Sequence, residues 1–222
     1  MSASLREALC AASRSLEQFG LNCGTAGNLS VRVENGFLVT PSGVKPAALT
    51  PAAIVAMGLD GSITDPRQQP SSEWRFHRDI YLARDDADAV VHVHSPYATA
   101  LACQRRDIPC FHYMIAKAGG DSIRCGTYAT FGTQALSDAA LLALTGRQAC
   151  LLANHGMIAL GVSLDKALDM TREVEELARQ YALALSCGTP VLLSAEEMRD
   201  ALERFKTYGG RDGQEQTSPG GG

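Results

Sequence analysis

The chain has 222 residues, seven cysteines, a formal net charge of −4 and a hydrophobic fraction of 45%. This length suits one domain with a substantial core, and the interspersed charges argue against nucleic acid or an acidic membrane as the main partner. No apolar run is long enough to cross a bilayer, and the N-terminus lacks a secretory signal pattern. We therefore expect a cytoplasmic protein with reduced cysteines.

The first third of the chain predicts a helix, a hairpin and a second helix. Apolar residues from Leu5 to Leu16 recur at helical spacing, and a glycine at position 20 marks the end of that helix. Two alternating segments, 28–33 and 37–40, flank an Asn-Gly pair and predict a β-hairpin. Residues 71–83 predict a helix whose first turn is capped by Ser71 or Ser72.

The middle of the chain predicts two inner strands. Residues 90–94 are an apolar run that we expect to be a buried strand, with Ser95 capping the next helix and Pro96 in its first turn. Residues 148–160 predict a second inner strand, interrupted at 154–156 by Asn-His-Gly. Strands alternate with helices, so the sequence favours an α/β fold with some antiparallel pairing.

The last third predicts two helices and a loose tail. A long amphipathic pattern runs from Ser163 to Cys187. Ser194 and Glu197 have the spacing of a capping box for a final helix. The residues after Tyr208 are rich in glycine and polar side chains, which is typical of a flexible segment.

Two histidines inside an apolar strand are the clearest chemical signal. His92 and His94 are separated by one residue, so on a strand their side chains share a face. His155 interrupts the other inner strand and is a third candidate ligand, since three neutral imidazoles match an open, catalytic zinc site. The alternative is that all three are ordinary hydrogen-bonded core, edge or loop residues.

Glu73 and the small residues around it are the second signal. A general base would suit Glu73, which is predicted to lie in the first turn of a helix after Ser71 and Ser72. That helix start and the small-residue loops at 24–30 and 40–44 offer N–H and hydroxyl groups to an anion. The alternative is a favourable charge near a helix dipole beside ordinary turns.

Several motifs together resemble a known family. They are "TAGNLSVR", "TPSG", "PSSEWRFH", "VVHVH", "YATFGT" and "NHG". The chain resembles the zinc-dependent class II aldolase/adducin superfamily, and "FHYMIA" and "FKTYG" point to its fuculose-phosphate branch. The resemblance implies one three-layer α/β domain over residues 1–208, with a central mixed, largely antiparallel sheet flanked by helices. Residues 209–222 would form a flexible C-terminal tail.

The resemblance also implies roles for site residues. His92, His94 and His155 would hold Zn²⁺, and Glu73 would be both the acid/base and a fourth, displaceable ligand. The residues expected to bind a substrate phosphate are Gly27, Asn28, Ser42, Gly43, Ser71 and Ser72.

The aldehyde end of the substrate would meet two tyrosines. The resemblance implies that Tyr113 comes from a neighbouring subunit and Tyr208 from a mobile tail, in a ring-like homotetramer with sites at subunit interfaces. The expected reaction is reversible cleavage of a ketose 1-phosphate, such as L-fuculose 1-phosphate, to dihydroxyacetone phosphate and a small aldehyde such as L-lactaldehyde.

Other functions stay open on the sequence alone. Epimerases, decarboxylases and dehydratases of the same superfamily use the same metal, although glutamate at position 73 favours the aldolase over the epimerases. An adducin-like binding module would need no open zinc site, and an unrelated zinc hydrolase is a third alternative. His77, one helical turn after Glu73, could support that residue, but we expect it to have a packing or surface role.

Overall fold

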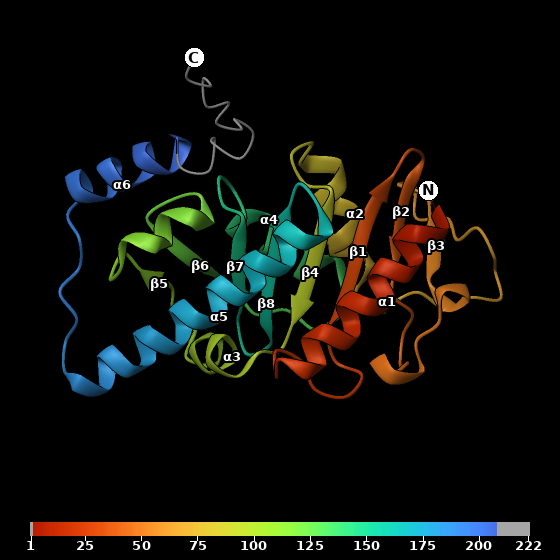
Figure 1. Ribbon diagram of the computed structural model, residues 1–222, viewed down its shortest axis with the longest axis horizontal. Coiled ribbons are helices and arrows are strands. Elements are labelled where there is room, and N and C mark those ends of the chain that lie inside the picture. The colour runs from red at the N-terminus through yellow and green to blue at the C-terminus, as the bar shows by residue number, and fades with distance from the viewer. Residues whose placement is uncertain (1, 208–222) are drawn as a thin grey trace, which may run out of the picture.

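The computed structural model describes residues 2–207 of the chain. An eight-stranded sheet forms the middle layer of the fold (Figure 1). Its strands are β1 (Asn28–Val33), β2 (Gly36–Val39), β3 (Val55–Met57), β4 (Ala89–Val93), β5 (Ile108–Pro109), β6 (Ser122–Gly126), β7 (Ala149–Leu152) and β8 (Gly156–Gly161). The strand order is β3-β2-β1-β4-β8-β7-β6-β5. Only β6 and β7 pair in parallel, which confirms the predicted mixed, largely antiparallel sheet.

Helices cover both faces of this sheet and complete three layers. They are α1 (Ser2–Gln18), α2 (Trp74–Ala83), α3 (Pro96–Cys103), α4 (Gln134–Ala143), α5 (Leu164–Cys187) and α6 (Ala195–Thr207), with short 3₁₀ turns η1 (Pro46–Ala48), η2 (Pro51–Ala53) and η3 (Tyr113–Ala118). Helices α1, α3 and α5 lie on one face, and α2 and α4 on the other (Figure 1). In residues 2–207, no helix combines the length and apolar character needed to cross a membrane.

Strand alternation divides the core in two. On β4, Val91 and Val93 face the cluster that contains α1, α3 and α5. Val90 faces the other cluster, where it packs with Phe76 and Ile80 of α2. His92 therefore points toward the α2 side of the sheet, with Phe76 against the edge of its ring.

Several predicted element ends are confirmed. Gly20 follows α1 with φ +67°, a left-handed conformation that glycine adopts easily. The Ser163 side chain accepts a hydrogen bond from the N–H of Lys166 at the start of α5. Ser194 and Glu197 bond reciprocally before α6, so the predicted capping box is present.

The predicted serine cap of α2 is wrong. Glu73 itself is the N-cap residue of α2, without a side-chain cap, and the Ser71 hydroxyl accepts from the Glu73 N–H at 3.2 Å. Ser95 does precede α3 as predicted, but its hydroxyl donates to the Met157 sulfur instead of capping the helix. Neither Ser71 nor Ser95 therefore caps a helix with its side chain; Ser71 binds the N–H of Glu73, and Ser95 binds Met157.

Residues 148–160 form two strands rather than one interrupted strand. Asn154 has φ +56° in the turn between β7 and β8, and the chain reverses there. The reversal lets β8 pair antiparallel with β4, with Met157 opposite Val93. This hairpin turn is what carries His155 to the end of β4.

A buried acid ties α2 to α4. Asp79 accepts hydrogen bonds from the Ser137 hydroxyl and the Gln134 amide, both at 2.6 Å, and pairs with Arg78 at 2.7 Å. Burial alone would raise the pKa of Asp79, but these hydrogen bonds outweigh it and lower the pKa below its ordinary value of 3.8.

We predict that Asp79→Asn lowers the free energy of unfolding by about 1–3 kcal/mol at pH 7, because buried donors lose a charged acceptor. The folded pKa is depressed, so the advantage of the wild type is present above pH 4 and is lost as the pH falls further. Urea unfolding at several pH values measures both effects. The exposed Asp85→Asn in the turn after α2 is the control, with a change under about 0.5 kcal/mol; equal losses in the two variants would contradict the prediction.

Candidate active site

Three imidazole rings converge where β4 meets the β7–β8 turn. The ring centroids of His92, His94 and His155 are 4.8–4.9 Å apart in every pair. Their candidate ligand nitrogens all lie within 4.8 Å of one another. The structure therefore brings together the three histidines that the sequence singled out.

Backbone contacts orient the His92 ring. Its Nδ1 lies 2.9 Å from the Met157 carbonyl oxygen, which can only accept, so Nδ1 carries the hydrogen. The bare Nε2 then lies 3.0 Å from Nε2 of His94. Burial, and then the neighbouring His92, lowers the pKa of both His94 and His155 to about 4. Neutral rings with converging lone pairs are the form that binds a metal ion.

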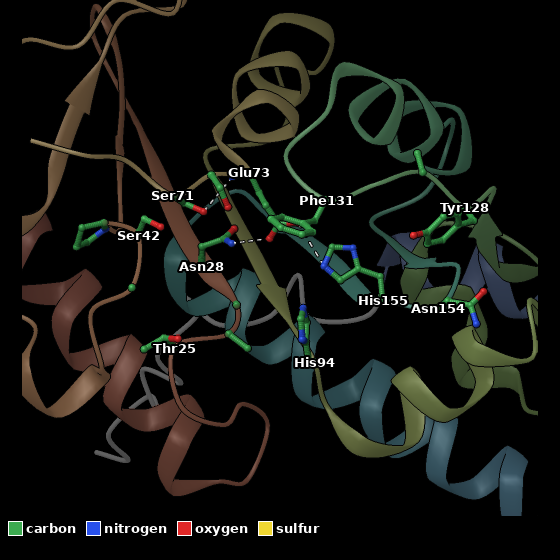
Figure 2. Close-up of a pocket in the computed structure, with 16 residues that line it drawn as sticks. Thr25, Asn28, Ser42, Ser71, Glu73, His94, Tyr128, Phe131, Asn154 and His155 are labelled. Atoms are coloured by element: carbon green, nitrogen blue, oxygen red, sulfur yellow. Dashed lines mark hydrogen bonds and ion pairs between the residues drawn. The ribbon is translucent and has the colours of Figure 1, made fainter.

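Glu73 completes this donor set. The side chain is buried, and its two carboxylate oxygens lie 3.3 Å from Nε2 of His92 and of His155. Figure 2 shows the contact with His155. Burial alone would raise the pKa of Glu73, but His92, His155 and a hydrogen bond from Asn28 outweigh it and lower the pKa to about 2. Its Oε1 atom is buried and makes no hydrogen bond with the described residues. A carboxylate oxygen without a hydrogen bond, lying among three imidazoles, is a suitable ligand for a divalent cation.

A cavity of about 300 Å³ opens beside this cluster (Figure 2). The carboxylate and two of the histidines line it, next to a wall of mostly small residues at 25–28, 41–43 and 71–72. Tyr128 and Phe131, from the segment between β6 and α4, form an aromatic wall. Among the described residues that line the cavity there is no lysine or arginine.

All of the predicted phosphate-binding residues line this one cavity: Gly27, Asn28, Ser42, Gly43, Ser71 and Ser72. Gly27 has φ +72°, and a Cβ there would lie 2.7 Å from the His92 carbonyl oxygen. Only glycine therefore keeps the backbone this close to β4. The wall offers hydroxyls, backbone amides and the positive end of α2, which together suit a phosphate.

The two predicted tyrosines do not join the cluster within one chain. Tyr113 is exposed on η3, lines a separate cavity and stacks on Phe205 of α6 with centroids 6.2 Å apart. Its supply from a neighbouring subunit stays a prediction. Tyr208 and the tail at 209–222 lie outside the described residues.

The aromatic wall was not assigned from the sequence. Phe131 is held by its neighbour Gly132, whose carbonyl oxygen accepts from Arg75 of α2 at 2.8 Å. Gly132 has φ +74°, and a Cβ there would lie 2.9 Å from the Ser72 carbonyl oxygen. The signal that could have found this wall is an aromatic residue directly before a glycine in a polar loop.

His77 is another residue whose place the sequence did not predict. It is fully buried, with Nε2 at 2.5 Å from the Asn28 side-chain oxygen and Nδ1 at 2.7 Å from the Ser30 hydroxyl. Burial, and then the neighbouring His92, lowers its pKa to about 3, so the ring is neutral. The expected packing or surface role is replaced by a hydrogen-bonded place behind Glu73.

The family is decided by comparison with known proteins. The model for the class II aldolase and adducin N-terminal domain matches residues 7–182. The chain belongs to the class II aldolase family. A 5-methylthioribulose-1-phosphate/5-deoxyribulose-1-phosphate aldolase of Rhodospirillum rubrum is 56% identical over 92% of each chain. An L-fuculose phosphate aldolase of Escherichia coli is 50% identical over 87% of this chain and 90% of the relative.

Solved structures agree with these relatives. An L-fuculose 1-phosphate aldolase superposes with a TM-score of 0.88 at 41% identity, covering 91% of this chain and 96% of that chain. The two relatives named above match this class II aldolase over most of its length, and both are aldolases. The prediction of an aldehyde-lyase is therefore confirmed. The family is metal-dependent, and the three-histidine cluster could hold the ion.

We predict that the purified aldolase retains about one divalent ion per chain and that His94→Ala lowers its affinity for Zn²⁺ by more than about 100-fold, because a ligand is lost. Elemental analysis and competition with a chelator measure this. His112→Ala is the matched control, since His112 is equally half-buried but lies outside the cluster. Unchanged affinity in the His94 variant would show that the cluster is not the metal site.

Proposed function

We propose that this aldolase reversibly cleaves a ketose 1-phosphate to dihydroxyacetone phosphate and a small aldehyde, with Zn²⁺ as cofactor. One observation carries the proposal: a three-histidine cluster, an ionised glutamate and a polar wall suited to phosphate all meet in one cavity. An adducin-like binding module has no use for this combination. A hydrolase of esters or peptides has no use for a phosphate wall.

The aromatic wall favours a substrate whose aldehyde part is apolar at its far end. Tyr128, Ala129 and Phe131 face the cavity opposite the small-residue wall. The relative from Rhodospirillum rubrum is named for 5-methylthioribulose and 5-deoxyribulose 1-phosphates. We therefore place these two sugar phosphates first and L-fuculose 1-phosphate second, as the substrate named in the Escherichia coli relative.

The reaction requires that a carbon–carbon bond break next to a ketone. A Zn²⁺ ion bound by His92, His94 and His155 would supply Lewis-acid polarisation of the ketone when present. The hydroxyl beyond the breaking bond loses its proton and becomes the aldehyde, while the bonding electrons stay on the carbon beside the ketone. Glu73 lies at the cluster and is ionised, so in cleavage it can first take up a proton, which balances the one that the hydroxyl releases, and then hand it to that carbon. In the reverse direction it takes the proton from the carbon.

The small-residue wall does no chemistry in this scheme. Gly27, Ser42, Gly43, Ser71 and Ser72 would fix the phosphate by backbone amides and hydroxyls. An amide nitrogen carries two hydrogens, so Asn28 can donate to Glu73 and also to the phosphate. Holding the phosphate places the reacting carbon at Glu73, which converts binding energy into orientation.

The aldehyde oxygen needs its own proton donor in the direction of synthesis, and the same group takes that proton back in cleavage. We propose that Tyr113 supplies it from a neighbouring subunit, in a homotetramer whose sites lie at subunit interfaces. The exposure of Tyr113 and its separation from the cluster within one chain support this assignment. Tyr208 is proposed to approach the same aldehyde from the tail.

We predict that the zinc-loaded protein releases dihydroxyacetone phosphate from all three sugar phosphates, with higher kcat/KM for the two 5-substituted pentuloses. Glu73→Gln should keep bound zinc but lower kcat by about 10²–10⁴-fold, because the amide cannot carry the proton. A coupled assay that reduces dihydroxyacetone phosphate with NADH measures release. No release from any of the three would refute the proposed function, and near-normal turnover in the variant would place the base elsewhere.

We predict that Tyr113→Phe lowers aldol cleavage by roughly 10²-fold, because the group that exchanges a proton with the oxygen of the aldehyde is lost. Exchange of the dihydroxyacetone phosphate proton with deuterium, followed by NMR, should change little, since that step involves Glu73 alone. Tyr97→Phe is the control for removing a partly exposed phenol elsewhere. Equal losses of cleavage and exchange in the Tyr113 variant would contradict its assigned role.

A further inference from the structure

A chain of buried hydrogen bonds leads away from Glu73 into the core between β1 and α2. Its members in order are Glu73, Asn28, His77, Ser30 and Tyr81, and each is at most 6% exposed. The successive distances are 3.0, 2.5, 2.7 and 2.7 Å. The last three members do not line the cavity, so they cannot touch a ligand bound in it.

The chemistry of the groups fixes the direction of this chain. An ionised carboxylate only accepts, so Asn28 must turn its amide nitrogen toward Glu73 and its oxygen toward His77. That oxygen also only accepts, so the hydrogen of the His77 ring is on Nε2. The bare Nδ1 then accepts from the Ser30 hydroxyl, which in turn accepts from Tyr81.

We propose that His77 is a positioning residue: its Nε2–H locks the Asn28 amide in the one orientation that donates to Glu73. The proposal rests on the role of Glu73 in the proposed function. With the lock in place, Asn28 holds Oε2 of the carboxylate, while Oε1 stays directed at the histidine cluster. Ser30 is compatible with the lock, because its hydroxyl can donate to the bare Nδ1 of His77 and accept from Tyr81.

Loss of the lock has a definite consequence. Without a donor at His77, the Asn28 oxygen is left buried without a partner, which is unfavourable. The Asn28 side chain would shift to satisfy that oxygen, and its 3.0 Å hydrogen bond to Glu73 would no longer hold the carboxylate in place. The proton transfer geometry would then be lost. Outer partners of this kind change activity by about 10–100-fold.

Two substitutions at one position separate positioning from packing. In His77→Gln the side-chain amide nitrogen can take the place of Nε2 and donate to Asn28. In His77→Asn the shorter amide can take the place of Nδ1 beside Ser30, but nothing then donates to Asn28. We expect His77→Gln to keep kcat within about fivefold and His77→Asn to lose about 10–100-fold in kcat with little change in KM.

A third variant controls for core damage on the same helix. Ile80 is fully buried on α2 and belongs to none of these hydrogen bonds. Ile80→Val should lower Tm without changing kcat, so a kcat loss in His77→Asn that exceeds this control reflects positioning. Equal kcat values for the glutamine and asparagine variants would overturn the proposal.

The tautomer provides a readout that needs no turnover. In ¹⁵N NMR spectra of imidazole-labelled protein, His77 should be the neutral Nε2–H form in the wild type and also in Ser30→Ala, because the Asn28 oxygen can only accept. An Nδ1–H ring in the wild type would overturn the proposal even if the enzyme is active. If no ketose 1-phosphate is cleaved, the proposed function fails while this measurement still decides whether the lock exists.

Discussion

An ionised carboxylate held beneath the surface next to three imidazoles is the constraint on which this structure depends. A buried charge is costly unless it is paired and hydrogen-bonded. Here Asn28 satisfies one oxygen of Glu73, and the other oxygen is directed at His155. A cation bound by the three histidines would compensate the charge of the buried carboxylate. The surrounding strands and helices hold Glu73 and the histidines in this position.

The antiparallel sheet brings the parts of this arrangement together. Asn28 lies opposite His92 in the register between β1 and β4, so the residue that supports the carboxylate and a predicted ligand are neighbours across two strands. On the other side of β4, pairing with β8 fixes the turn that carries His155. Helix α2 begins at Glu73 and packs over the same edge. Four segments, distant in sequence, therefore meet without a long loop.

The sequence predicted much of this because the relevant signals are local. Helical spacing, the Asn-Gly turn and the His-x-His pattern each involve a few neighbouring residues, and the corresponding elements are present. The reversal at Asn154 was missed, since a short apolar run interrupted by polar residues reads equally well as one strand or two. The place of His77 was missed because Asn28 and Ser30 are far from it in the chain. Only the packing of α2 against β1 brings His77 within hydrogen-bond distance of Asn28 and Ser30.

The cavity wall that suits phosphate has no lysine or arginine within the described part of the chain, so its own groups offer an anion only fixed dipoles. Such dipoles act over a few ångströms, and the chain as a whole is negatively charged. Long-range steering of a phosphorylated sugar by the side chains of this wall is therefore weak. A cation bound at the histidine cluster would then be the main source of longer-range attraction, so it would affect the capture of the substrate as well as its chemistry.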